Sequence, residues 1–213
     1  MSNRYLVLAT AAALLCAGPA FAQNYGQYGV GAAQEQPSFG PTPHDSTPGD
    51  DTGPVSRDSM AIAEDMRLKG ECDKAVPILR RLSDRGAGFE ISQLDLGLCL
   101  LDLAKLESDA AKAGALRGEA ASWILRAANA GFAKAQAKSV VLYLDAVGVA
   151  ADPVEAQKWA LLYHDNGMRL GFGLPDIAPD LRQRLDTALN DAGRSQARKR
   201  ARDWAPSVAS AEE

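Results

Sequence analysis

The clearest feature of the chain is a pattern of apolar positions that occurs twice between residues 119 and 167. In the first copy, small or aromatic residues recur at spacings of three and four, which place them on one face of a helix. These are Ala120, Trp123, Ile124, Ala127 and Ala128. The second copy has Ala156, Trp159, Tyr163 and His164 at the equivalent positions, displaced by 36 residues. A fixed displacement of this size between helical segments predicts stacked helix pairs.

Each copy predicts two helices joined by a turn. Gly131 and Gly167 occupy equivalent positions at the end of the first helix, where glycine adopts the left-handed conformation without strain. The second helix is expected to turn Ala135, Ser139, Leu142, Tyr143 and Ala146 inward. A turn containing Gly148 follows. Asp152 then provides an N-cap and Pro153 the first residue of the next helix.

A weaker copy of the pattern precedes these two. A first helix, capped by Ser56 or Asp58, is expected to reach about Leu68. The apolar spacing then recurs at Ala75, Ile78, Leu79 and Leu82, with Ile78 in the tryptophan position. This copy is longer than the others, and we expect its second helix to continue until Gly114 stops it. The predicted repeats are residues 72–116, 117–152 and, in part, 153–167.

The C-terminal part predicts a closing helix hairpin. Residues 168–175 are expected to form a loop, and residues 176–205 the hairpin. Its apolar stripe comprises Leu181, Leu185, Ala188, Leu189 and Ala192. The sequence Asp191-Ala192-Gly193 is expected to separate the two helices. A stacked array needs an end unit with a polar outer face, and the arginine-rich last helix suits that role.

Both ends of the chain predict segments outside the helical domain. An apolar run follows Arg4, and Ala20-Phe21-Ala22 has the form of a cleavage site, so residues 1–22 are interpreted as a signal peptide cleaved between Ala22 and Gln23. The alternatives are a membrane anchor, for which the run is short, and a lipoprotein signal at Cys16. Residues 23–56 are rich in Gly, Pro and Gln and predict a disordered tether. Residues 206–213 predict a disordered tail, and residues 57–205 the folded domain.

Two cysteines remain after export, Cys72 and Cys99. An even count in an oxidising compartment is typical of a disulfide. Cys72 begins one predicted helix and Cys99 lies late in its antiparallel partner, so the two can meet. Two buried thiols or a redox pair are the competing interpretations.

Charge changes the picture only locally. The chain has a formal net charge of −4, which argues against general nucleic-acid binding. Basic residues nevertheless crowd the last helix, namely Arg194, Arg198, Lys199, Arg200 and Arg202. Behind a signal peptide we interpret them as the solvated face of a capping helix, with attraction to anionic lipid or an acidic partner as the sharper alternative.

Candidate catalytic chemistry is scarce. The chain contains no P-loop, His-Glu-x-x-His or Ser-x-x-Lys motif. Of its two histidines, His44 falls in the predicted tether and His164 at a helix position expected to pack. No catalytic, cofactor-binding or metal-binding residue is therefore nominated. Trp123 and Trp159 could stack on sugars, but their shared repeat position favours core packing.

Over about 50 residues the chain resembles the Sel-1-like repeats, a branch of the tetratricopeptide-like solenoids. The resemblance comprises Ala120, Trp123, Ala127, Ala128, Gly131, Ala135, Gln136, Tyr143, Gly148, Val149, Asp152, Ala156 and Trp159. The chain departs from the family pattern at Ser139-Val140, at Ala146, where the family has glycine, and at Tyr163-His164.

The resemblance implies an all-α, right-handed α/α superhelical solenoid without a cofactor. It also implies an adaptor for a protein or peptide partner, for example in an envelope complex. Because some cysteine-rich bacterial members bind or hydrolyse β-lactams, a cell-wall binder or weak β-lactam-hydrolysing enzyme is the alternative, and a structural envelope protein held by its tether is a third. The expected location is the periplasm, with secretion as the alternative.

Overall fold

A computed structural model describes residues 57–207, and this part of the chain is all-helical, without strands. The predicted signal peptide, the tether and all but the first two residues of the predicted tail lie outside the described residues. The helices, in chain order, are α1 (Arg57–Leu68), α2 (Cys72–Ser83), α3 (Glu90–Leu106), α4 (Ala110–Asn129), α5 (Ala133–Leu144), α6 (Pro153–His164), α7 (Gly167–Gly171), α8 (Pro179–Ala188) and α9 (Asp191–Arg202).

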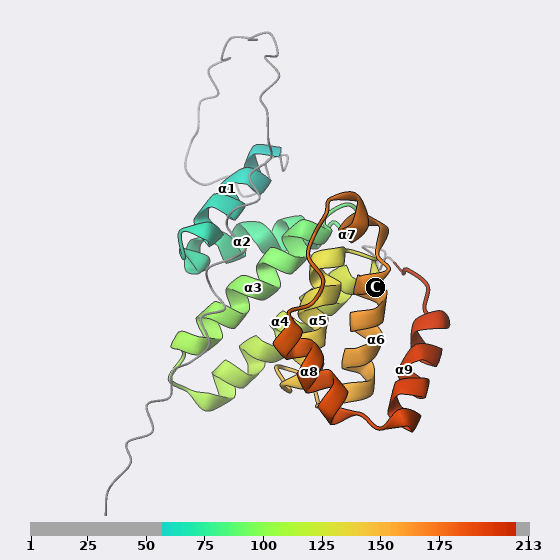
Figure 1. Cartoon of the computed structure of the whole chain (residues 1–213). Coiled ribbons are helices and arrows are strands. Elements are labelled where there is room, and N and C mark those ends of the chain that lie inside the picture. Colours follow the sequence, from blue (N-terminus) through green and yellow to red (C-terminus); the bar gives the residue numbers. More distant parts are fainter. Residues whose placement is uncertain (1–56, 208–213) are drawn as a thin grey trace, which may run out of the picture. The chain divides into compact units, whose positions relative to one another are not determined.

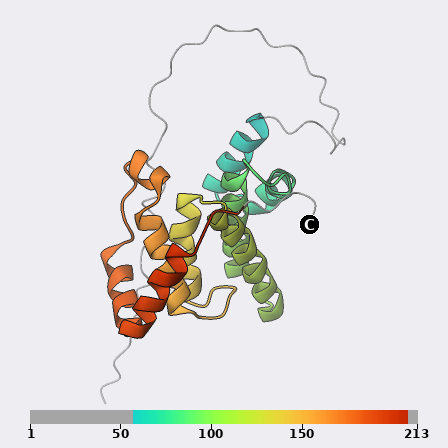
Figure 2. The same cartoon turned by 90° about the vertical axis from the view of Figure 1, so that its right-hand side faces the viewer.

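From α1 to α6, each helix packs against the next one in the chain (Figure 1). The last helix breaks this order, because α9 returns to pack against α6; the two lie alongside each other in Figures 1 and 2. Helix α8 also contacts α6, and α7 contacts α5. Two of the C-terminal helices, α8 and α9, therefore pack on α6.

Small side chains let the central helices approach closely. Ala120, Ala127 and Ala128 of α4 are fully buried, as predicted from their spacing. Opposite them in α3 is Gly97, where an added Cβ would lie 2.5 Å from Ile124 Cγ1 and 2.9 Å from the carbonyl oxygen of Ala120. Packing at this distance buries apolar surface without voids, so the α3–α4 contact depends on having glycine, which has no side chain, at position 97.

The disulfide between Cys72 and Cys99 is confirmed. It joins the first residue of α2 to α3, with the two Cα atoms 5.0 Å apart. Both residues are buried in the core, in the part of the chain where the sequence pattern has Ile78 in place of tryptophan. The bridge therefore fastens the least typical of the predicted repeats.

The start of α6 and the end of α4 are also as predicted. The carboxylate of Asp152 accepts a hydrogen bond from the backbone N–H of Glu155 at 3.0 Å, and α6 begins at Pro153. Gly131 has φ +91, and the N–H of Phe132 donates to the carbonyl of Ala127, which closes α4 with a Schellman-type turn.

The predicted extension of the second helix to Gly114 is wrong. Helix α3 ends at Leu106, and α4 begins at Ala110, so Gly114 lies inside the longest helix. The cause is Asp109, whose side chain accepts hydrogen bonds from the N–H groups of Ala111 and Lys112. This cap starts a new helix, and a single exposed glycine costs too little to interrupt it.

Two positions of the first copy, which contains Trp123, differ from expectation. Ala146 does not turn inward on a helix; it is exposed beyond the end of α5 and has φ +53. Trp123 is only partly buried, whereas Trp159 is 1% exposed. Trp123 instead contacts polar neighbours, because its indole N–H donates to Glu119 at 3.3 Å and the Arg126 guanidinium lies 5.4 Å from its ring.

The end of the second copy was also predicted incorrectly. Gly167 does not end α6 with a left-handed turn; it is the first residue of α7, which replaces part of the expected loop at residues 168–175. Asn166 causes this, since its side chain accepts from the N–H groups of Met168 and Arg169. His164 is exposed rather than packed.

Finally, the break between the last two helices is earlier than predicted. Helix α8 ends at Ala188, and Asn190 caps α9 by accepting a hydrogen bond from the N–H of Gly193 at 2.9 Å. Asp191, Ala192 and Gly193 are therefore inside α9.

Candidate protein-binding cleft

Most of the predicted signature residues serve the core and do not gather into a site. Ala120, Ala127, Ala128, Ala135, Ala156 and Trp159 are buried. Tyr143 is partly buried, Gly148 lies in the turn after α5, and Asp152 caps α6. Of the signature and repeat-position residues, Gly131, Gln136 and Gly167 line the open cleft described next.

An open cleft of about 830 Å³ lies between the end of α4, the second half of α6, α7 and α9. We call it the α6–α9 cleft. Its lining consists of Ala130, Gly131, Gln136, Leu161, Leu162, Asp165, Asn166, Gly167, Met168, Arg198, Ala201, Arg202, Trp204 and Pro206. It exists because α9 returns to α6 and brings the basic helix beside the turn that precedes α7.

Side-chain amides fix one wall of the cleft. The Asn166 amide nitrogen donates to the carbonyl of Gly131 at 2.9 Å and to the side-chain oxygen of Gln136 at 2.8 Å. Its oxygen accepts from the backbone N–H groups that start α7. Because these amide groups already have partners, they hold α4, α5 and α7 in place and leave ligand contacts to other residues.

The opposite wall is α9 and the segment that follows it. The Trp204 ring packs edge-on against Trp159, with the ring centroids 6.2 Å apart. Arg200 pairs with Asp152, the N-cap of α6, and with Glu155 in the first turn of that helix, each at 2.9 Å. Beyond Trp204, the N–H of Ser207 donates to the carbonyl of Asn129 at 2.8 Å. These contacts anchor the wall to α6 and to the end of α4.

Arg198 and Arg202 give the cleft its positive charge. They are four residues apart, on one face of α9, and both are exposed. Neither has an acidic partner within residues 57–207. Asp165, at the end of α6, is the acidic residue in the lining. The cleft thus presents two guanidinium groups on one wall and one carboxylate among its other residues.

Beside the cleft, α7 exposes large apolar side chains. Met168, which also lines the cleft, is 40% exposed, Leu170 is 60% exposed and Phe172, which follows the helix, is 76% exposed. We call these three residues the α7 apolar surface. Exposed apolar residues this close together in a folded protein often mark an interaction site.

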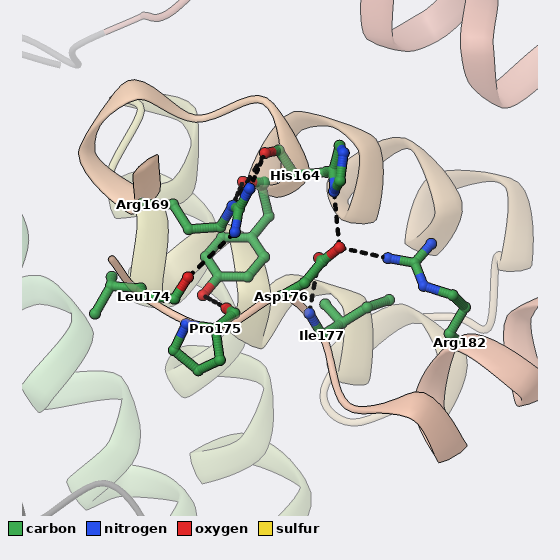
Figure 3. Close-up of polar contacts among 8 residues, drawn as sticks. His164, Arg169, Leu174, Pro175, Asp176, Ile177 and Arg182 are labelled. Atoms are coloured by element: carbon green, nitrogen blue, oxygen red, sulfur yellow. Dashed lines mark hydrogen bonds and ion pairs between the residues drawn. The ribbon is translucent and has the colours of Figure 1, made fainter. Parts of the chain in front are cut away.

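Polar contacts hold this surface in position (Figure 3). The Arg169 guanidinium donates to the carbonyls of Tyr163, His164 and Leu174 at 2.6–3.1 Å. The Tyr163 hydroxyl donates to the carbonyl of Pro175 at 2.7 Å. The segment around α7 is therefore tied to the end of α6 by groups on both sides.

Asp176 fastens the same segment farther along the chain. One carboxylate oxygen lies 2.7 Å from His164 Nδ1 and 2.8 Å from Arg182, and the other accepts from the N–H of Ile177 (Figure 3). Burial opposes ionisation of this carboxyl, but the His164 contact, the Ile177 N–H and the Arg182 charge outweigh it, so the pKa of Asp176 is lowered. This histidine–aspartate contact joins α6 to the loop before α8, so we interpret it as structural.

Sequence reasoning missed both the cleft and the α7 apolar surface. Arg198 and Arg202 were visible in the sequence as part of a basic helix. Which basic residues of that helix have acidic partners, and which border the cleft, depends on where α9 docks. For Leu170 and Phe172, the only sequence signal was a run of large apolar residues in a predicted loop.

Over residues 57–207, no three His, Cys, Asp or Glu side chains are grouped so that they could hold a metal ion. Within the same range, none of the helices combines the length and apolar character required to cross a bilayer. Comparison of the chain with protein-family profiles, with curated proteins and with solved structures finds no match.

Proposed function

We propose that the protein is an exported adaptor of the Sel-1-like type, which binds a protein or peptide partner in the periplasm without catalysing a reaction. The helix pairs of the proposed solenoid correspond to α2–α3 and α4–α5, with α6 opening a third unit that α8 and α9 cap. The recurring alanine and tryptophan positions and the stacking of each helix on the next support this assignment.

The observation that carries the binding role is the α7 apolar surface beside the α6–α9 cleft. Leu170 is 60% and Phe172 76% exposed, so covering them would contribute roughly 1–2 kcal/mol of burial for each side chain. The polar contacts of Arg169 and Tyr163 hold the surrounding backbone in place, so a partner would bind it at little ordering cost. A protein partner that covers these side chains explains both features.

The test is native co-purification of the tagged protein from the envelope fraction, in wild-type form and as the Leu170→Ser/Phe172→Ser variant. The matched control is Leu106→Ser, because Leu106 is 83% exposed at the end of α3, outside the cleft. We expect a partner with the wild type and the control that is lost or strongly reduced with the double variant. Equal recovery with all three proteins would contradict a binding role for the α7 apolar surface.

A further inference from the structure

The basic residues of α9 fall into two groups. Arg194 pairs with Asp191, Lys199 with Asp203, and Arg200 with Asp152 and Glu155. The remaining two, Arg198 and Arg202, have no acidic partner within residues 57–207, and both line the α6–α9 cleft. In α9, every basic residue outside the cleft therefore has a carboxylate partner. The two basic residues that line the cleft have none among the described residues.

The rest of the lining limits what can bind beside these arginines. The Gln136 and Asn166 amides are occupied by their contacts with each other and with backbone carbonyls. The indole N–H of Trp204 is buried and has no acceptor among the described residues. The free groups on the α9 wall are therefore hydrogen-bond donors. The carboxylate of Asp165 carries the same negative charge as an acidic ligand and would repel it. Such a ligand therefore has to lie toward α9.

We propose that the α6–α9 cleft binds an acidic segment of the partner protein, with Arg198 and Arg202 each pairing with a carboxylate. Guanidinium groups recognise carboxylates through paired hydrogen bonds, which gives direction as well as charge. Met168 belongs to both the cleft and the α7 apolar surface, so the same segment would place an apolar side chain next to its acidic ones. This inference names the ligand class for the proposed adaptor and rests on that function.

The occupant is argued to be a peptide segment because the site is concave and continuous with an apolar surface. An anionic lipid surface would meet exposed arginines on a convex face more readily than in a cleft. The chain's own Glu212 and Glu213 are a second source of carboxylates, since Pro206 already lines the cleft. The experiment below distinguishes the peptide from both an anionic lipid surface and the chain's own C-terminal glutamates.

The experiment begins with selection of random displayed peptides on the immobilised full chain. The best peptide is then labelled with fluorescein and titrated by fluorescence polarisation. Three proteins are compared: the wild type, Arg198→Gln/Arg202→Gln and the control Lys112→Gln/Arg117→Gln. The control removes the same net charge from the N-terminal half of α4, away from the cleft.

We expect the selected peptides to carry at least two acidic residues and an apolar one. Losing a hydrogen bond to a charged group weakens binding about tenfold, so the Arg198→Gln/Arg202→Gln variant should bind about 100-fold more weakly. The control should bind within about twofold of the wild type, and added salt should weaken wild-type binding.

Enriched peptides without acidic residues, or equal losses in both double variants, would overturn this inference and leave the adaptor function standing. Arginine-dependent binding to phosphatidylglycerol vesicles without any peptide preference would also overturn it. So would a tenfold gain in peptide affinity on Glu212→Gln/Glu213→Gln substitution, because the chain's own tail would then be the occupant. Failure to select any peptide, together with no co-purified partner, would contradict the adaptor function itself.

Discussion

Replacement of Gly148 by alanine tests how closely the turn after α5 approaches α4. Gly148 has φ +72, and a Cβ there would lie 2.0 Å from the carbonyl oxygen of Arg117 and 2.5 Å from its carbonyl carbon. The clash is with helix backbone, which cannot move aside as a flexible side chain could. Gly173 provides a matched control, because it has φ +62 and a Cβ there would meet nothing within 4 Å.

The two variants separate two costs. Both place alanine in the left-handed region, at about 1–2 kcal/mol, and both gain about 0.4–1 kcal/mol because alanine restricts the unfolded chain. Gly173→Ala should therefore lower the free energy of unfolding by about 1 kcal/mol. Gly148→Ala adds the overlap with α4, about 1–3 kcal/mol, which makes about 3 kcal/mol in total.

The assay is urea unfolding followed by far-UV circular dichroism, with thermal unfolding as a second measurement. For a domain of this size, about 3 kcal/mol corresponds to a fall of about 6–12 °C in Tm. The slope of the unfolding free energy against urea should be the same in both variants, since the surface exposed on unfolding does not change. Equal losses for Gly148→Ala and Gly173→Ala would refute the close approach of the turn to α4.

Three further predictions concern stability. Replacing Cys72 and Cys99 by serine should lower the unfolding free energy by about 3.5 kcal/mol in urea, because the bridge spans 27 residues; an unchanged urea midpoint would contradict its stabilising role. Ala146→Gly should raise the unfolding free energy by about 0.5–1 kcal/mol, since it relieves the left-handed alanine at φ +53, and a loss of stability would show that the alanine side chain makes a contact that matters. Burial raises the pKa of Asp95 to about 6, and the nearby Arg67, at 2.8 Å, only partly offsets it. The native state therefore binds this proton more tightly than the unfolded chain. The wild type should gain about 2.4 kcal/mol relative to Asp95→Asn as the pH falls from about 7 to about 4; a difference independent of pH, measured by urea unfolding, would contradict the raised pKa.

Signals confined to a few neighbouring residues were predicted well. The pair Asp152-Pro153 specifies the start of α6, because the cap and the fixed proline φ act within one turn. The buried alanines of α4 followed from helical periodicity alone. Even the Cys72–Cys99 bridge needed only the antiparallel pairing of two adjacent helices.

Predictions failed where two local signals competed. Gly114 was expected to end a helix, but the Asp109 cap started a helix through it. Gly167 was treated as the copy of Gly131, but Asn166 caps α7 at that position. In both cases a side-chain hydrogen bond to free N–H groups outweighed the preference of glycine for a helix end.

The candidate site depends on contacts that are distant in the sequence. Arg200 reaches Asp152 and Glu155, 48 and 45 residues away, and thereby fixes which face of α9 meets α6. The face left over carries Arg198 and Arg202. A helical pattern shows that these two residues share a face, but the docking of α9 decides that this face borders a cleft.

The most direct test of the proposed binding role is photo-crosslinking in living cells. A photoreactive phenylalanine analogue is placed at Phe172 in one protein and at Leu106 in another, so that the two exposed apolar positions are compared within the same fold. We predict a discrete crosslinked band from position 172 and none from position 106. No crosslink from position 172, or the same bands from both positions, would contradict a partner on the α7 apolar surface.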